Sequence, residues 1–255
     1  GIRGNILPGD ASAGVEGLSM YDIQPVARNV TARTGIKFTF ASEDGVTVIK
    51  AKGEASHAAW PEGGNNAITG LISLLCALPL ADGDCKDALH QLNALLPHGD
   101  CKGRALGIAQ EEPVAGPLTV AFSLLEITDT GLKGFFDSRV PLCATEENCL
   151  QPAKAAFEEK GFTFEAVQGA PHHVPADSPF IKTLLRRYEE YTGLKGECLS
   201  TGGGTYVHDI PGGVAFGCTL PGFDTHLHGP DERVRVSDLL LSARLFAHII
   251  VDLCE

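Results

Sequence analysis

The stretch LTVAFSLLEITDTGLKGFFDSRVP, residues 118–141, predicts two β-strands joined by a turn at DTG, residues 129–131. Both halves are rich in β-branched and aromatic residues and alternate apolar with polar side chains, which is typical of strands. A second hairpin is predicted by KFTFA, residues 37–41, and GVTVIKAKG, residues 45–53, around SEDG. Antiparallel pairing is therefore expected to organise this part of the chain.

Helical periodicity separates and follows these strands. Residues 65–80, NNAITGLISLLCALPL, place apolar side chains three and four positions apart, which predicts a buried helix that stops at Pro79. A helix within 144–161 is expected to begin at Thr145 and to end at Gly161. Further helices are expected in the second part of 11–35, in 86–96, in 178–193 with Ser178 as N-cap and Gly193 as stop, and from Ser237; further strands are expected in the first part of 11–35, in 162–168 and in 213–217.

The segment PHHVPADSP, residues 171–179, has three prolines and paired histidines and marks a boundary between packed units. We therefore expect an α/β fold with two domains, 1–171 and 172–255. The first has helices on one face of a mainly antiparallel sheet. The second shows helix, strand and helix, which is too little for a sheet of its own, so its strand should join others supplied elsewhere.

Composition limits the kind of partner. The chain has 255 residues and a net charge of −12, which opposes binding to nucleic acid and to anionic membrane surfaces. No apolar run reaches the ~20 residues that a membrane helix needs. Eight cysteines form no CxxC pair, which favours reduced thiols and a cytoplasmic location, although a bridge between Cys85 and Cys101 remains open.

The segment GFDTHLHGPDERV, residues 222–234, contains two histidines that resemble one edge of a metal site. Alternate residues of an extended segment point to opposite sides, so only one of them faces any given site. We favour His228, because the following glycine, proline and Glu232 can orient its ring. A solvated loop histidine is the simpler alternative. One imidazole does not hold zinc, which needs at least three protein ligands, so the site is incomplete within this chain.

Three other segments contain candidate binding groups. His57, in GEASHAAWPEGGNNAI, is expected at an exposed strand end, or else as a structural histidine. The glycines of STGGGTYVHD, which include Gly203 and Gly204, allow backbone N–H groups to approach an anion, or form a flexible loop. Arg139, in FFDSRVP, can clamp a carboxylate bidentately, or form a surface ion pair.

Together with RGNILPGDASA, residues 3–13, and VPADSPFIKTLLRRYEEYTG, residues 174–193, these segments resemble the dinuclear zinc metallopeptidases that include aminoacylases, carboxypeptidases and dipeptidases. The sequence is most similar to Xaa-His dipeptidases of the PepV type. The resemblance implies site residues as follows: His228 as a zinc ligand, His57 as the oxyanion-stabilising group of the lid domain, Asn5 as a polar group at the reaction centre, and Arg139, Gly203 and Gly204 as the binding site for the substrate carboxylate.

The resemblance also implies two zinc ions and a dipeptide or N-acyl amino acid substrate. The family's amino-terminal metal segment, with its HxD motif and Glu-Glu pair, has no counterpart in these residues. We therefore expect a fragment, formed by a lid domain and the carboxy-terminal part of a catalytic domain, that lacks its amino-terminal catalytic partner segment. Alone, it should bind no zinc tightly and should not catalyse. The alternatives are a non-catalytic binding or dimerisation module, or a deacylase or desuccinylase of the same family.

Overall fold

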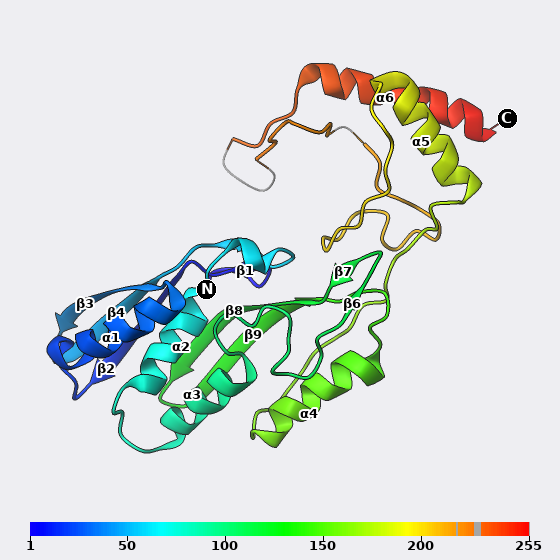
Figure 1. Ribbon diagram of the computed structural model, residues 1–255. Helices are drawn as coiled ribbons and strands as arrows, with labels where there is room; N and C mark the ends of the chain where they lie inside the picture. Colours follow the sequence, from blue (N-terminus) through cyan, green and yellow to red (C-terminus); the bar gives the residue numbers. More distant parts are fainter. Residues whose placement is uncertain (218, 227–230, 255) are drawn as a thin grey trace. The chain divides into compact units, whose positions relative to one another are not determined.

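The computed structural model describes residues 1–217, 219–226 and 231–254. It divides the chain into two compact units, Gly1–Ala170 and Pro171–Glu255 (Figure 1). The α/β fold class is confirmed, since helices are combined with antiparallel strands. The division falls one residue from the predicted boundary, whereas the roles of the two parts as lid and catalytic portion stay predictions.

A three-stranded antiparallel sheet forms one part of the first unit. Its strands are β2 (Asp10–Glu16), β4 (Val46–Lys52) and β3 (Lys37–Glu43), in the order β2-β4-β3. The predicted β3–β4 hairpin is confirmed. Helix α1 (Met20–Thr34) connects β2 to β3, as expected; it begins at a capping box on Ser19 and ends at Gly35, which has the positive φ of 73° that favours glycine.

The hairpin predicted within residues 118–141 is also confirmed. Strands β8 (Thr119–Thr128) and β9 (Gly131–Arg139) pair from Thr119↔Arg139 to Thr128↔Gly131, with a bulge between Phe122 and Leu124. On the edge of β8 that faces away from β9, the Val120 N–H donates to the Cys101 carbonyl at 2.8 Å, and the Phe122 carbonyl accepts from Asn66 at 2.8 Å. These bonds fix the end of β8 that lies opposite Arg139.

Helix α2 (Ala67–Ala77) is the centre of the first unit. It packs against β2, β4 and β8, and against α1 and α3 (Asp84–Leu95), so that one apolar helix serves both sheets (Figure 1). Asn66 caps its N-terminus by accepting from the Ile68 N–H at 2.9 Å, and the helix ends before Pro79, as predicted. The largest fully buried apolar side chains of this core include Ile72 and Leu74 of α2 itself, together with Ile23, Val30, Ile36, Ile49, Ile108 and Leu118.

The carboxy-terminal part of this unit confirms a helix and contradicts a strand. A π-helical turn at Glu146–Leu150, capped by Thr145, continues into α4 (Gln151–Glu159), and Gly161 follows with φ 81°. Residues 162–168 are all described and form no strand, so that prediction was wrong. Their alternating phenylalanines pack on α4 instead: the ring centroids of Phe164 and Phe157 lie 5.2 Å apart.

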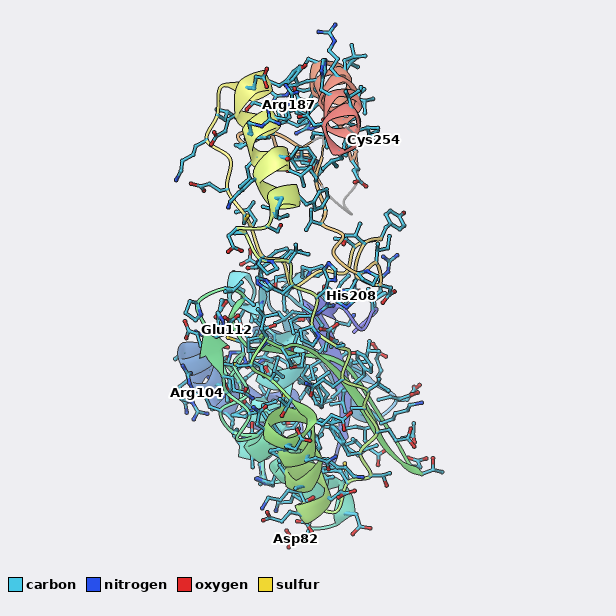
Figure 2. All side chains as sticks on the ribbon, turned by 90° about the vertical axis from the view of Figure 1, so that its right-hand side faces the viewer. Asp82, Arg104, Glu112, Arg187, His208 and Cys254 are labelled. Carbon is cyan, nitrogen blue, oxygen red and sulfur yellow. The ribbon has the colours of Figure 1, made fainter. Side chains whose placement is uncertain are left out.

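The second unit is built on two helices, α5 (Pro179–Thr192) and α6 (Val236–Cys254), both as predicted. Arg187, labelled in Figure 2, reaches from α5 to α6 and donates to Asp252 through Nε at 2.6 Å and through Nη2 at 2.5 Å. The apolar contact between the helices is made by Ile181, Leu184, Leu245 and Ile249.

The strand predicted at 213–217 is wrong, since these residues are described and form none. Val214 and Phe216 pack against the helix pair. An extended segment needs a neighbouring strand to form a sheet, and none is present in the described part of this unit. The alternation of Val214 and Phe216 therefore reflects their packing against the two helices.

The described cysteines are free thiols, so no bridge joins Cys85 to Cys101. Burial raises the pKa of Cys76 to about 11, and it also raises the pKa values of Cys101 and Cys149. These partly or fully buried thiols are therefore protonated at neutral pH.

Within the described ranges, the helices are all too short or too polar to cross a membrane.

Candidate functional site

Two short strands bring Asn5 and His57 side by side. Strand β1 (Ile6–Leu7) pairs antiparallel with β5 (Ser56–His57), with Ile6 opposite His57. The Asn5 carbonyl accepts from the Ala58 N–H at 3.0 Å, which extends the ladder by one bond. The resemblance connects these two residues to one reaction centre, and the structure places their backbones in contact.

The His57 ring has a defined protonation pattern. Its Nδ1 accepts from the Ala59 N–H at 3.1 Å, so the proton of the neutral ring lies on Nε2. The ring is half-buried, and its centroid lies 5.4 Å from that of the Trp60 indole. In this tautomer Nε2 is the donor nitrogen of the half-buried neutral ring. Its role at an oxyanion stays a prediction.

Thr119 connects the His57 loop to the strand beside Arg139. Its hydroxyl donates to the Ala58 carbonyl at 3.2 Å, and both residues are buried. In the β8–β9 ladder, Thr119 lies directly opposite Arg139. Asn5, His57 and Arg139 therefore gather at one edge of the first unit, although they come from three separate parts of the sequence.

Arg139 is the last residue of β9, and Asp137 holds its guanidinium. Nε donates to Asp137 Oδ1 at 2.6 Å, and Nη2 donates to Oδ2 at 2.7 Å. The side chains of Arg139 and Asp137 are only 28% and 15% exposed, so the pair is less screened than an ordinary surface ion pair. The ion pair expected as an alternative to carboxylate binding is thus present, but its shielded position distinguishes it from a solvated one.

Two buried hydroxyls flank this edge. Ser56 Oγ precedes His57 and Ser138 Oγ precedes Arg139, and neither has a hydrogen-bond partner among the described residues. A buried polar group without a partner costs about 1–3 kcal/mol, and such groups call for a specific explanation in native proteins. Sequence reasoning missed these serines, and it also missed Asp137 and Thr119. Only Asp137 had a local signal, because residues two apart on a strand share a face.

Gly203 and Gly204 belong to the second unit. The Gly203 N–H donates to the Thr201 hydroxyl at 3.1 Å, within an irregular and largely exposed loop. Since Arg139 belongs to the first unit, the structure does not relate these glycines to it. Their shared role in carboxylate binding stays a prediction.

The predicted zinc ligand His228 lies outside the described residues. Its neighbour His226 has its Nε2 at 3.2 Å from Asp224 Oδ2 and at 3.2 Å from Arg233 Nη2, and the positive guanidinium opposes a second cation there. Among the residues that the structure describes, no group of three His, Cys, Asp or Glu side chains meets in an arrangement that could hold a metal. The described donors therefore do not fit a zinc ion by themselves.

A cleft lies elsewhere in the first unit. It has a volume of about 950 Å³ and runs between β2 and β8, over the apolar side chains Ile68, Leu71, Ile72 and Leu75 of α2. Its described lining includes none of the predicted site residues. The candidate site is therefore the edge around His57 and Arg139, where the predicted site residues of the first unit lie.

Comparison with known proteins gives the following relatives. No protein-family model matches the chain. It is 32% identical to “Putative dipeptidase YtjP” of Bacillus subtilis, 28% identical to the Beta-Ala-Xaa dipeptidase of Lactobacillus delbrueckii subsp. lactis, and 26% identical to a similarly named protein of Staphylococcus epidermidis. Each alignment covers 100% of this chain and 54% of the relative, so the chain spans about half the length of the curated relatives it matches.

Proposed function

We propose that this chain carries the substrate-binding part of a dipeptidase active site, and that the whole protein hydrolyses dipeptides or short peptides with a free carboxylate. The proposal depends on one observation, the convergence of Asn5, His57 and Arg139 at one edge of the first unit. The similarity of the entire chain to proteins named as dipeptidases supports it.

Arg139 binds the carboxylate of the substrate in this proposal. A guanidinium is always charged and presents its donors in a planar fork that matches a carboxylate. Its position at the end of a strand, with an ion pair holding it in place, suits a residue that must orient one end of a small substrate. The Gly203–Gly204 backbone is a second proposed contact to the same carboxylate.

His57 acts at the scissile peptide bond itself. Its Nε2–H donates to the carbonyl oxygen as negative charge develops there, and the Ala59 N–H on Nδ1 keeps the donor on the correct nitrogen. Asn5 lies beside it and supplies a polar side chain at the same edge. In this proposal, recognition and charge stabilisation are carried by residues of the same unit.

Zinc dependence is a separate part of the proposal. In the resembling enzymes two zinc ions supply an activated water and polarise the peptide carbonyl. Here the zinc ligand His228, the lid role of 1–171, the catalytic role of 172–255 and the cytoplasmic location rest on the sequence alone. None of the roles given above for Arg139, His57 and Asn5 requires a metal.

The test compares a dipeptide with its carboxy-terminal amide in the whole protein. Replacing Arg139 by Met should lower kcat/KM for the dipeptide about 100-fold and leave the amide nearly unchanged, because only the acid has the carboxylate. His57→Gln should instead lower kcat for both substrates about 100-fold or more, since both form an oxyanion. Equal losses for acid and amide in Arg139→Met would contradict the assignment.

Residues 1–255 alone should show no dipeptide turnover with added Zn²⁺, since the described donors do not assemble a metal site. Measured turnover would contradict this part of the proposal. An N-acyl amino acid also has a free carboxylate, so Arg139 does not discriminate against it, and the dipeptide is favoured by the names of the relatives. A non-catalytic binding module would show neither activity in the whole protein.

A further inference from the structure

Asp137 and Arg139 form a unit within β9. They are two residues apart on the strand, so both side chains lie on one face of the hairpin. The Asp137 carboxylate accepts from Nε and from Nη2 of Arg139 at 2.6 and 2.7 Å, which is the bidentate arrangement. Two parallel hydrogen bonds define the plane of the guanidinium as well as its position.

This arrangement occupies one defined edge of the guanidinium. A guanidinium offers two bidentate edges, one formed by Nε and Nη2 and the other by Nη1 and Nη2. Asp137 takes the first, which fixes the plane in which the guanidinium can meet a carboxylate. We propose that Asp137 is a positioning residue, which orients Arg139 for recognition of the substrate carboxylate. This inference rests on the proposed function.

The Asp137–Arg139 ion pair and the His57 loop are both next to one small apolar cluster. In the ladder, Asp137 lies opposite Ala121, which is fully buried and clusters with Leu7 and Ala58. Leu7 belongs to β1 and Ala58 follows His57. An orientation fixed by Asp137 is therefore fixed relative to the His57 side of the site, and the distance between the two ends of a bound peptide is set by the fold.

Charge alone predicts the opposite effect. A negative Asp137 beside the binding position repels a substrate carboxylate, so removing that charge should tighten binding if Asp137 had no other role. As a positioning residue, Asp137 should weaken binding when it is changed. In Asp137→Asn, the new amide offers one acceptor oxygen and an NH₂ that cannot accept from Nη2, so one of the two hydrogen bonds that orient the guanidinium is lost. The direction of the change in KM therefore distinguishes a purely electrostatic effect of Asp137 from a positioning role.

The experiment measures kcat and KM of the whole protein for a dipeptide and for its carboxy-terminal amide. With Asp137→Asn we expect KM for the dipeptide to rise about tenfold, with kcat and the kinetics of the amide nearly unchanged. Asp137→Glu keeps the charge and moves the carboxylate by one methylene, so it should also raise KM. Asp10→Asn removes an exposed pair with Lys52, 2.9 Å long, and should change nothing.

A KM for the dipeptide that falls or stays constant in Asp137→Asn, while Arg139→Met abolishes the preference for the acid, would overturn the positioning role alone. A wild-type KM in Asp137→Glu would do the same, since it would show that only charge matters. If the unaltered protein cleaves the dipeptide and its amide equally well, the role of Arg139 in the proposed function fails, and the positioning role fails with it.

Discussion

Replacing Thr119 by Val should destabilise the first unit through one hydrogen bond. The Thr119 hydroxyl donates to the Ala58 carbonyl at 3.2 Å, and the two residues are 6% and 0% exposed. Valine has nearly the same shape, so no cavity forms, but the Ala58 carbonyl loses this donor in a place that water does not reach. Leaving a buried group unpaired costs about 1–3 kcal/mol.

The length of the bond sets the magnitude within that range. O–H···O bonds are commonly about 2.7–2.8 Å long, so a bond of 3.2 Å is among the weaker ones, and we expect a loss of about 1–1.5 kcal/mol in the free energy of unfolding. With a urea m value of about 2 kcal/mol/M, the midpoint of unfolding should fall by about 0.6 M.

The single tryptophan of the chain, Trp60, makes this measurable in the first unit alone. It lies beside His57, so its fluorescence during urea titration follows the unit that contains the substitution. Thr128→Val is the matched control: it is the same change at the exposed end of the same strand, and it should shift stability by less than about 0.5 kcal/mol. Equal midpoints for Thr119→Val and Thr128→Val would refute the reasoning.

Three further predictions concern other parts of the chain. Asn66→Ala removes the cap of α2 and the donor to the Phe122 carbonyl, so the same fluorescence assay should show a loss of about 2 kcal/mol, and a loss below about 0.5 kcal/mol would contradict this. The hydrogen bonds from Arg187 lower the pKa of Asp252, so their stabilisation is present above the usual pKa of about 4 and is lost as the pH falls through the lower, folded value; helix melting followed by circular dichroism should lose this acid dependence in Asp252→Asn. Modification of Cys76 by a thiol reagent should stay slow until the pH approaches the raised pKa of about 11, and rapid reaction at pH 8 to 9, roughly the ordinary thiol range, would show that the site opens to water.

The sequence predicts the elements whose signals are local. The caps at Thr145 and Ser178 and the stop at Gly193 were correct, because a cap depends on a few neighbouring residues. Both hairpins were correct for the same reason, since each turn lies between two complementary strands. Local sequence is therefore sufficient to predict an element whose caps or turn lie within the same segment.

The two failed strands show the limit of this reasoning. In residues 162–168 phenylalanines alternate with polar side chains, and in 213–217 Val214 and Phe216 alternate with small residues; both patterns indicate that one side is buried. Neither pattern indicates the surface that buries that side. That surface is α4 together with Phe136 of β9 for 162–168, and the helix pair α5 and α6 for 213–217. A strand forms only when another strand supplies its hydrogen bonds, and the residues of the segment do not show whether such a partner is present.

The contacts that support the candidate site could not be predicted from the sequence, whereas the roles of its residues stay predictions. The segment motifs identified His57 and Arg139, but the bond from Thr119 to Ala58 joins distant parts of the chain and leaves no local pattern. Asp137 was within reach of sequence reasoning, because its spacing from Arg139 places both on one strand face. The groups that hold a site in place are the harder part, since tertiary contacts select them.

The two ends of the β8–β9 hairpin differ: one is held by hydrogen bonds to other segments, and the other is exposed. Bonds from Cys101 and Asn66 hold β8 where it faces Arg139, whereas the turn at 129–130 and the neighbouring end of β8 are exposed. The bulge lies between the two ends. A spectroscopic label or an inserted loop at the turn would therefore leave the opposite end in register, which makes the hairpin tip a suitable attachment point for reporting on the site without altering it.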